Sequence, residues 1–243
     1  ERRFPVAVRV YDIVLAAGEN VPVVYFRRAA NIQSGTGDMG PFREVLSKYP
    51  DMELAGGQTP IRVWISMVDR DYARAEKFLA DSPRKDFQDI DFSFYFPKSW
   101  YEGMIAREKG DAAKATAAFR ECRDILAQRL AFKPEHARTI TVLAQVDANL
   151  GQKDLAISEA QHAIDLMPTS KDIYDGALVL EGLAQVYTWT GDRDRAIQVV
   201  QKLLSMPGYL NYGRLKLHPL WAPLRGDPRF DKILQSLAPK ENR

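Results

Sequence analysis

The sequence predicts an all-α fold, a right-handed superhelical solenoid of helical hairpins that ends in a C-terminal capping segment. Apolar residues recur at helical spacing along most of the chain, and small residues stand where paired helices would touch. Turn residues separate the helices at a nearly even interval, since successive turns lie 33, 40, 41 and 40 positions apart. These turn residues are Gly37, Arg70, Gly110, Gly151 and Gly191. Such a period predicts hairpins stacked one on the next, with insertions between them.

The clearest hairpin covers residues 137–170, a stretch of 34 residues with a turn at Gly151. Ala144 and Ala156 are small enough to let its two helices approach closely, and Gly151 suits a helix that ends in the left-handed conformation. In its length and in the order of its small residues, the segment resembles a tetratricopeptide repeat. The resemblance implies stacked hairpins that bind a protein or a peptide.

The first residues of the chain are interpreted as part of a repeat. We expect a helix over 3–17 with Pro5 in its first turn, and we assign residues 1–18 to the second helix of a truncated repeat. One face of this helix groups Ala7, Tyr11, Val14 and Leu15. Because no initiator Met precedes it, we expect the chain to be a piece of a longer protein.

Five hairpins and a tail are expected after this helix. The hairpins are predicted over 22–50, 56–82, 96–133, 137–168 and 177–206, and the cap and tail over 212–243. Asp71 and Asp111 directly follow turn residues, which predicts that each caps the N-terminus of a second helix. Ala30, Ala75 and Gly103 are predicted to stand where two helices approach closely.

Residues 84–97 interrupt the pattern with a loop that is rich in aromatic side chains, namely Phe87, Phe92, Phe94, Tyr95 and Phe96. We interpret it as a connector packed on the hairpins, because large aromatic residues usually contribute to cores. An exposed aromatic patch for a partner is the alternative. The same loop contains Asp86, Asp89 and Asp91, which lack the Gly and Glu of a calcium loop and are assigned to solvent or to caps.

The tail from Leu215 to Ala238 abandons the repeat order. Pro219, Pro223 and Pro228 predict short segments, and Phe230 to Leu237 predicts a last amphipathic helix that helps to cover the end of the array. The stretch HPLWAPLRGDPRF resembles the end of tetratricopeptide regions in bacterial serine/threonine kinases, winged-helix regulators and adenylate cyclases. That resemblance implies a signalling parent protein with a separate output domain.

Composition narrows the class of partner. The chain has 243 residues with 34 Lys and Arg against 32 Asp and Glu, so no strong field favours nucleic acid, and we expect none to bind this segment directly. No apolar run approaches the ~18 residues of a membrane span, which predicts no membrane insertion by this segment. Cys122 is the single cysteine, which excludes an internal disulfide. The compartment stays open, either cytoplasmic or extracytoplasmic in a membrane-anchored parent.

Catalytic, metal and cofactor motifs do not emerge. His136, His162 and His218 lie in different segments without a partner motif, so no metal site and no cofactor is expected. Residues 82–85 spell SxxK, but Pro83 disfavours the helical nucleophile that this motif requires. No pair of carboxylates can be placed from spacing alone. The segment is therefore predicted to be non-catalytic.

The tetratricopeptide resemblance implies a set of groove-facing positions on the first helix of each hairpin. Carried over position by position, the implied partner-binding residues are Arg27, Asn31, Trp64, Met67, Trp100, Met104, Arg107, Thr141, Gln145, Glu181, Gln185 and Trp189. Trp and Arg often dominate binding energy, whereas the alternative for the three Trp residues is ordinary core packing. The Lys, Arg and Asn pattern with which relatives clamp a terminal carboxylate does not continue beyond Arg27 and Asn31.

These expectations lead to one function and one alternative. The leading hypothesis is a non-catalytic scaffold that binds a peptide or protein in a concave groove, as the sensory or regulatory region of a bacterial signalling or transcription-regulatory protein. The alternative is a structural spacer or an oligomerisation module, for instance a homodimer formed through the loop from Phe87 to Phe96.

Overall fold

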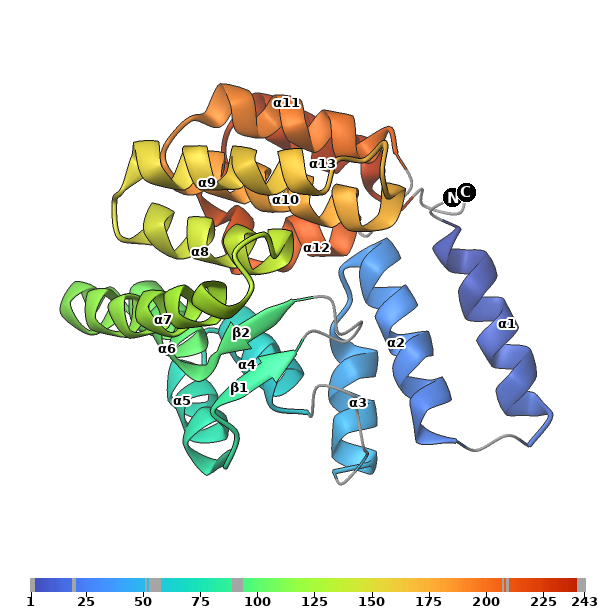
Figure 1. Cartoon of the computed structure of the whole chain (residues 1–243). Coiled ribbons are helices and arrows are strands. Elements are labelled where there is room, and N and C mark those ends of the chain that lie inside the picture. Colours follow the sequence, from blue (N-terminus) through green and yellow to red (C-terminus); the bar gives the residue numbers. More distant parts are fainter. Residues whose placement is uncertain are drawn as a thin grey trace. The chain divides into compact units, whose positions relative to one another are not determined.

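The computed structural model describes residues 3–18, 21–50, 52, 58–88, 94–206, 208 and 210–239. In these parts of the chain it has fourteen helices and a single two-stranded ribbon (Figure 1). The prediction of an all-α protein is therefore confirmed. Across the described ranges, none of the helices combines the length and the apolar character that crossing a membrane requires.

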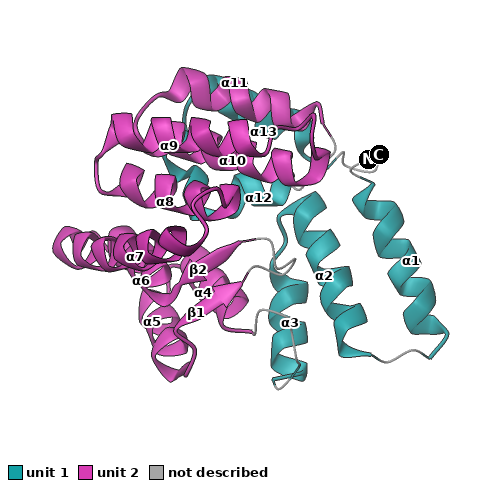
Figure 2. Ribbon diagram, in the orientation of Figure 1, with its two compact units in different colours: residues 1–54, 209–243 teal, residues 55–208 magenta. Residues whose placement is uncertain are grey.

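The chain divides into two compact units (Figure 2). Unit 1 joins residues 1–54 to residues 209–243, and unit 2 comprises residues 55–208. The sequence does not announce this division, because the two parts of unit 1 come from opposite ends of the chain.

Unit 2 consists of four helical hairpins. In chain order they are α4 (Thr59–Val68) with α5 (Tyr72–Asp81), α6 (Lys98–Glu108) with α7 (Ala112–Phe132), α8 (Ala137–Asn149) with α9 (Lys153–Leu166), and α10 (Ile173–Trp189) with α11 (Arg193–Leu204). The two helices of each hairpin pack against each other, and each hairpin also contacts the next one along the chain. Helix α10 begins before the predicted residue 177, because the Asp172 side chain accepts the backbone N–H groups of Tyr174 and Asp175.

All four hairpins of unit 2 have the same turn. Its central residue is left-handed, with φ of 58° at Arg70, 79° at Gly110, 78° at Gly151 and 81° at Gly191. The residue that follows donates its backbone N–H to a carbonyl five residues earlier, at 2.9 Å in every case. This bond is the one that closes a helix C-terminus on a left-handed residue. The predicted turn positions, including Gly37 of unit 1 at φ 75°, are confirmed.

Carboxylates then start the second helix in three of these four hairpins. Asp71, Asp111 and Asp192 accept the backbone N–H of the residue three positions later, at 3.0, 3.0 and 3.1 Å. The predicted caps at Asp71 and Asp111 are confirmed. In the hairpin of α8 and α9 the corresponding residue is Gln152, whose side chain makes no such bond.

Small residues hold the helices of unit 2 close together. Ala75, Ala144 and Ala156 are fully buried, as predicted. At Gly103 an added Cβ would lie 2.7 Å from the Phe119 ring, so the absence of a side chain on α6 makes room for that ring of α7. These contacts explain why the pattern of small residues recurs with the hairpins.

The predicted loop over 84–97 contains a short antiparallel ribbon, which corrects the sequence-based expectation. Strand β1 (Asp86–Gln88) pairs with β2 (Tyr95–Pro97), and Phe87 stands opposite Phe96. Phe87 and Phe94 are buried, as the connector interpretation requires. Phe92, Asp89 and Asp91 lie outside the described residues.

Unit 1 combines the N-terminal helices with the tail. It contains α1 (Phe4–Ala16), α2 (Pro22–Thr36), α3 (Gly40–Lys48), α12 (Tyr212–Leu217), a 3-10 helix (Pro219–Leu224) and α13 (Pro228–Leu237). Helices α1, α3 and α12 each contact α2. Gly213 allows the approach of α12, because an added Cβ would overlap the backbone carbonyl of Gln33. On α2 the buried small residue is Ala29, whereas the predicted Ala30 is only half-buried.

We expect the left-handed turns to control stability. At Gly110 and Gly151 an added Cβ would meet no atom within 4 Å, so replacement by Ala introduces backbone strain without a clash and should lower the free energy of unfolding by about 1 kcal/mol. Arg70→Gly should raise that free energy or leave it unchanged, because the strain is relieved while the unfolded chain gains freedom. Urea denaturation of the three variants measures this, with Gln128→Ala on an exposed face of α7 as the control. An unstable Arg70→Gly variant would contradict it.

Candidate functional site

Five of the twelve predicted binding residues lie in one connected group in unit 2. Arg107 comes from α6, Gln145 from α8, and Glu181, Gln185 and Trp189 from α10. These are the first helices of three successive hairpins, as the predicted positions require. The group, together with Asn149 and Glu108, is called the polar network here.

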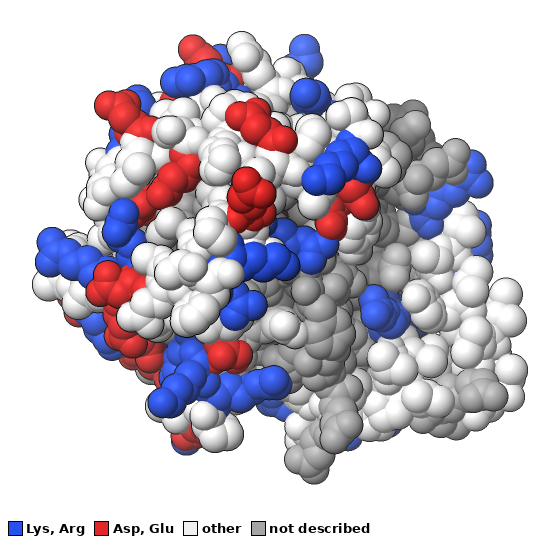
Figure 3. Space-filling view, in the orientation of Figure 1, with Lys and Arg blue, Asp and Glu red and all other residues white. Residues whose placement is uncertain are grey.

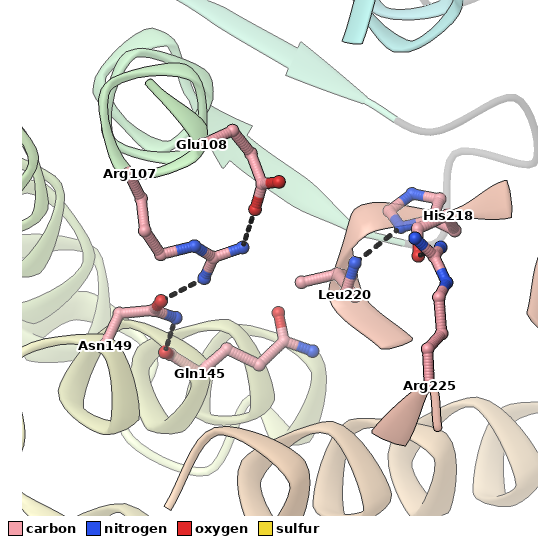
Figure 4. A network of polar contacts seen from close by, with 7 residues as sticks. All are labelled: Arg107, Glu108, Gln145, Asn149, His218, Leu220 and Arg225. Carbon is pink, nitrogen blue, oxygen red and sulfur yellow. Dashed lines mark hydrogen bonds and ion pairs between the residues drawn. The ribbon is translucent and has the colours of Figure 1, made fainter. Parts of the chain in front are cut away.

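Arg107 is the centre of the polar network. Its guanidinium carbon lies 3.3 Å from the centroid of a Trp189 ring, and the group donates to the side-chain oxygens of Asn149 and Glu108 (Figure 4). Stacking of an Arg fork on Trp is a strong form of cation–π contact. One side chain of α6 therefore connects α8 and α10.

Amide groups continue the polar network from α8 to α10. Asn149 donates to the backbone oxygen of Gln145 at 2.7 Å, and the Gln145 amide donates to Gln185 at 2.6 Å. The Gln185 amide in turn donates to a Glu181 carboxylate oxygen at 3.1 Å. Gln145, Gln185 and Glu181 are all buried. The two helices meet closely here because Gly182 has no Cβ, which would overlap the methyl group of Thr141.

Burial shapes the chemistry of this network. Removal from water lowers the pKa of Arg107 to about 10, and the nearby Glu108 carboxylate offsets part of that change. The guanidinium therefore remains a cation at neutral pH. None of the described residues accepts from Arg107 Nε or donates to Gln145 Oε1, although both atoms are buried. Unsatisfied polar atoms of this kind are costly, and they recur at functional sites.

The other predicted residues of unit 2 are mostly packed away from solvent. Trp100 and Met104 are buried, and the Trp100 ring lies 4.7 Å from the Phe96 ring. Met67 is buried, and the buried Thr141 hydroxyl donates to the backbone oxygen of Ala137. Of the two alternatives for Trp100, groove anchor or core residue, its burial favours the core. Trp64 and Trp189 are half-buried, so part of each ring meets solvent.

Two of the twelve residues belong to unit 1. Arg27 is exposed on α2, and Asn31 is half-buried one turn later, where its amide donates to the Arg27 backbone oxygen at 2.9 Å.

The structure also brings together two carboxyl groups that sequence analysis missed. Asp147 of α8 is fully buried and accepts from Arg123 Nε of α7 at 2.7 Å. Glu159 of α9 hydrogen-bonds to Asp147, and burial, followed by the Asp147 charge and this bond, raises the Glu159 pKa to about 8. Asp147 Oδ2 and Glu159 Oε2 lack a donor from the described residues. A proton on the Glu159 carboxyl group would provide the donor for a hydrogen bond between the two groups. Nothing in the local sequence signals this pair, because its members are on different helices.

The remaining candidates for chemistry have structural roles. Cys122 is buried, and burial raises its pKa to about 12, which keeps the thiol protonated and inert. Ser82 of the SxxK stretch follows the last residue of α5 and lies outside any helix. His218 caps the 3-10 helix of unit 1 by accepting the Leu220 backbone N–H at 3.3 Å, and Arg225 donates to its backbone oxygen (Figure 4). Among the described residues no group of His, Cys, Asp and Glu is arranged to hold a metal ion.

Charges of both signs alternate over the surface of unit 2 on the face shown in Figure 3. Ion pairs also join successive hairpins of unit 2. Glu76 of α5 accepts from Lys109 and Lys114 at 2.9 and 2.8 Å, and Arg138 of α8 pairs with Asp175 of α10. This distribution agrees with the balanced composition and shows no extended basic face on that side.

Comparison with models of known protein families and with curated protein sequences returned no match. We therefore assign a function from the chain's own residues and their geometry.

We expect the Asp147 and Glu159 pair to make stability depend on pH. The Glu159 pKa is about 8 in the folded chain and close to 4.5 in the unfolded chain. The contribution of Glu159 to the free energy of unfolding is therefore largest below pH 4.5 and falls as the pH rises towards 8. Glu159→Gln keeps a neutral donor at this position and should remove that slope. At pH 8 the Glu159→Gln variant should have a higher free energy of unfolding than the original chain. Because Glu159 is only half-buried, solvent screening limits this difference to roughly 1 to 2 kcal/mol.

Urea denaturation between pH 5 and pH 8.5 would measure the effect, with the exposed Glu121→Gln on α7 as the matched control. An advantage of Glu159→Gln that is the same at every pH would contradict the assignment of the proton to Glu159.

Proposed function

We propose that this chain is a non-catalytic binding scaffold of tetratricopeptide-like hairpins, stacked as a right-handed solenoid, which holds a peptide or protein against the first helices of unit 2. The observation that carries the proposal is the Arg107 and Trp189 stack within the polar network. Arg and Trp are the residue types that most often dominate binding energy at protein interfaces.

The distribution of polar groups supports this assignment. Core packing needs no ionised group, and a buried Arg and Glu cost free energy unless hydrogen bonds and nearby charges compensate for the lost water. Here Arg107 and Glu181 lie on first helices, while α9 and α11 bury mainly Ala, Ile, Val and Leu against the hairpins. The Arg107 network draws its side chains from first helices, whereas the Asp147 cluster also uses Arg123 of α7 and Glu159 of α9. The gathering of Arg107, Trp189 and the amide groups on first helices supports a recognition role for those helices.

A partner would meet this network at its exposed edges. Trp189 and Arg107 are half-buried, and so is Asn149. Trp64 of α4 offers a second partly exposed indole. A ligand that covers these groups would gain the stacking surface of the rings and bonds to polar groups that are already oriented, which lowers the entropy cost of binding. Arg27 and Asn31 of α2 remain candidates for a separate contact.

The tail suggests the biological setting. Its resemblance to the end of tetratricopeptide regions in bacterial signalling proteins supports a sensory or regulatory role, in which an output domain elsewhere in a parent chain responds to binding. A structural spacer or oligomerisation module is the second candidate. The burial of seven of the twelve implied binding residues favours it, because a buried residue stabilises hairpins without any ligand.

Peptide display offers a direct test. We expect a random peptide library to yield sequences that bind the chain, and Trp189→Ala should weaken their binding by about tenfold or more, the loss typical of a central interface aromatic. Arg107→Lys keeps the charge but loses the planar fork, so it should weaken binding by a smaller factor. Phe132→Ala removes an aromatic side chain that is 92% exposed at the end of α7 and serves as the matched control.

Circular dichroism on each variant separates loss of binding from loss of fold. If the peptides bind the Trp189→Ala and Arg107→Lys variants as tightly as the original chain, the polar network is not part of the binding site. A library that yields no binder at all would favour the spacer.

A further inference from the structure

Helix α1 of unit 1 exposes a continuous apolar stripe. Val6, Val10 and Ile13 are 42%, 53% and 69% exposed, and their spacing of four and three residues places them on one face of the helix. Large apolar side chains are normally exposed singly, whereas a row of three on one helix marks an interaction surface. No other helix among the described residues has three such residues.

The other side of α1 is already occupied. Ala7, Tyr11, Val14 and Leu15 are half-buried, and α1 packs against α2. At the start of the helix the Phe4 side chain lies over Gly35 of α2, where an added Cβ would approach Phe4 Cβ to 3.0 Å. The stripe therefore faces away from the contact that holds α1 in unit 1, and a partner can cover it without displacing that contact.

A hollow adjoins the stripe. It has a volume of about 300 Å³ and is lined by Arg3, Phe4, Val6, Ala7 and Asn31. Val6 belongs both to the hollow and to the stripe, so the two form one surface. Phe4, Val6 and Ala7 line part of this hollow and Arg3 and Asn31 the rest, so beside the exposed apolar row it suits one large side chain from a partner.

The charges beside the stripe are cationic. Arg3 and Arg9 are exposed, and Arg9 stands three residues after Val6 and four before Ile13, directly beside the stripe. The single acidic residue of α1 is Asp12, which accepts from Arg28 Nε of α2 at 2.6 Å and is thereby neutralised. In Figure 3 the area over α1 carries few charged side chains, and those are blue. The surface is thus apolar with a positive margin.

The positive charge beside the stripe favours an acidic partner over a second copy of this chain. If a second copy of this chain docked antiparallel with Val10 against Val10, the Arg9 side chains of the two copies would be neighbours, and like charges at an interface oppose association. A helix with an apolar face and acidic margins complements both the stripe and Arg9. A two-helix contact of this type also matches the 13-residue length of α1.

We propose that the stripe and hollow of α1 dock an acidic amphipathic helix of another protein. The partner helix lies along Val6, Val10 and Ile13, places one large apolar side chain in the hollow, and sets a carboxylate beside Arg9. This surface is in unit 1 and is independent of the site proposed on unit 2.

Two synthetic peptides of about 18 residues test the proposal, since this length forms a helix once it is bound. Both place Leu on one helical face; the acidic peptide carries Glu along the margins, and the basic peptide carries Lys at the same positions. Fluorescence anisotropy should give a Kd for the acidic peptide at least about tenfold below that for the basic one, with the preference falling as salt is added.

Variants then locate the contact. Val10→Ser/Ile13→Ser should weaken acidic-peptide binding by at least about tenfold. Arg9→Glu keeps the apolar row and should remove the preference for the acidic peptide, which tests the site even if the Ser variant misfolds. Phe132→Ser, an exposed apolar change in unit 2, should bind like the original chain.

Equal affinity for the two peptides, or binding of neither, would overturn the proposal. So would full binding of the acidic peptide by a folded Val10→Ser/Ile13→Ser variant. A dimer in sedimentation that is lost in this variant would also overturn it, because a second copy of the chain would then cover the stripe.

Discussion

The left-handed turn between the paired helices of unit 2 is the constraint on which the rest of that unit depends. A chain that leaves one helix and enters the next within two or three residues must take a positive φ at one position, and the carbonyls at the helix end must still find donors. Arg70, Gly110, Gly151 and Gly191 meet both needs with one backbone geometry. Each turn sets the direction of its second helix, and so decides which residues of the first helix face the next hairpin.

Close packing follows from this geometry. Once the turn brings the two helices together, the positions at their contact admit only small side chains, which is why Ala75, Ala144 and Ala156 are fully buried. At Gly103 even a methyl group would collide with the Phe119 ring. Side chains of the first helices then meet across hairpins: Arg107 bonds Asn149, and Gln145 bonds Gln185, although about forty residues of sequence separate the members of each pair.

The two units carry surfaces with different chemistry. The polar network of unit 2 is largely buried and held by its own hydrogen bonds, and Trp189 and Arg107 are its partly exposed edges. The stripe on α1 is apolar and open, with cationic margins. A surface of the first kind favours selective recognition, because unsatisfied polar groups reject a poorly matched ligand, whereas one of the second kind gains affinity from area.

The local features of this protein follow from short stretches of its sequence. Helical periodicity, the turn residues and the Asp71 and Asp111 caps depend on neighbours in the chain, so a short stretch of sequence is enough to predict each of them. Three features become visible only in the folded chain: the tail belongs with the N-terminal helices, Trp100 packs in the core beside Phe96, and Glu159 lies next to Asp147. Those features depend on contacts between segments that are distant in the sequence. A periodic pattern predicts that one face of a helix is buried, but it does not say which other element covers that face.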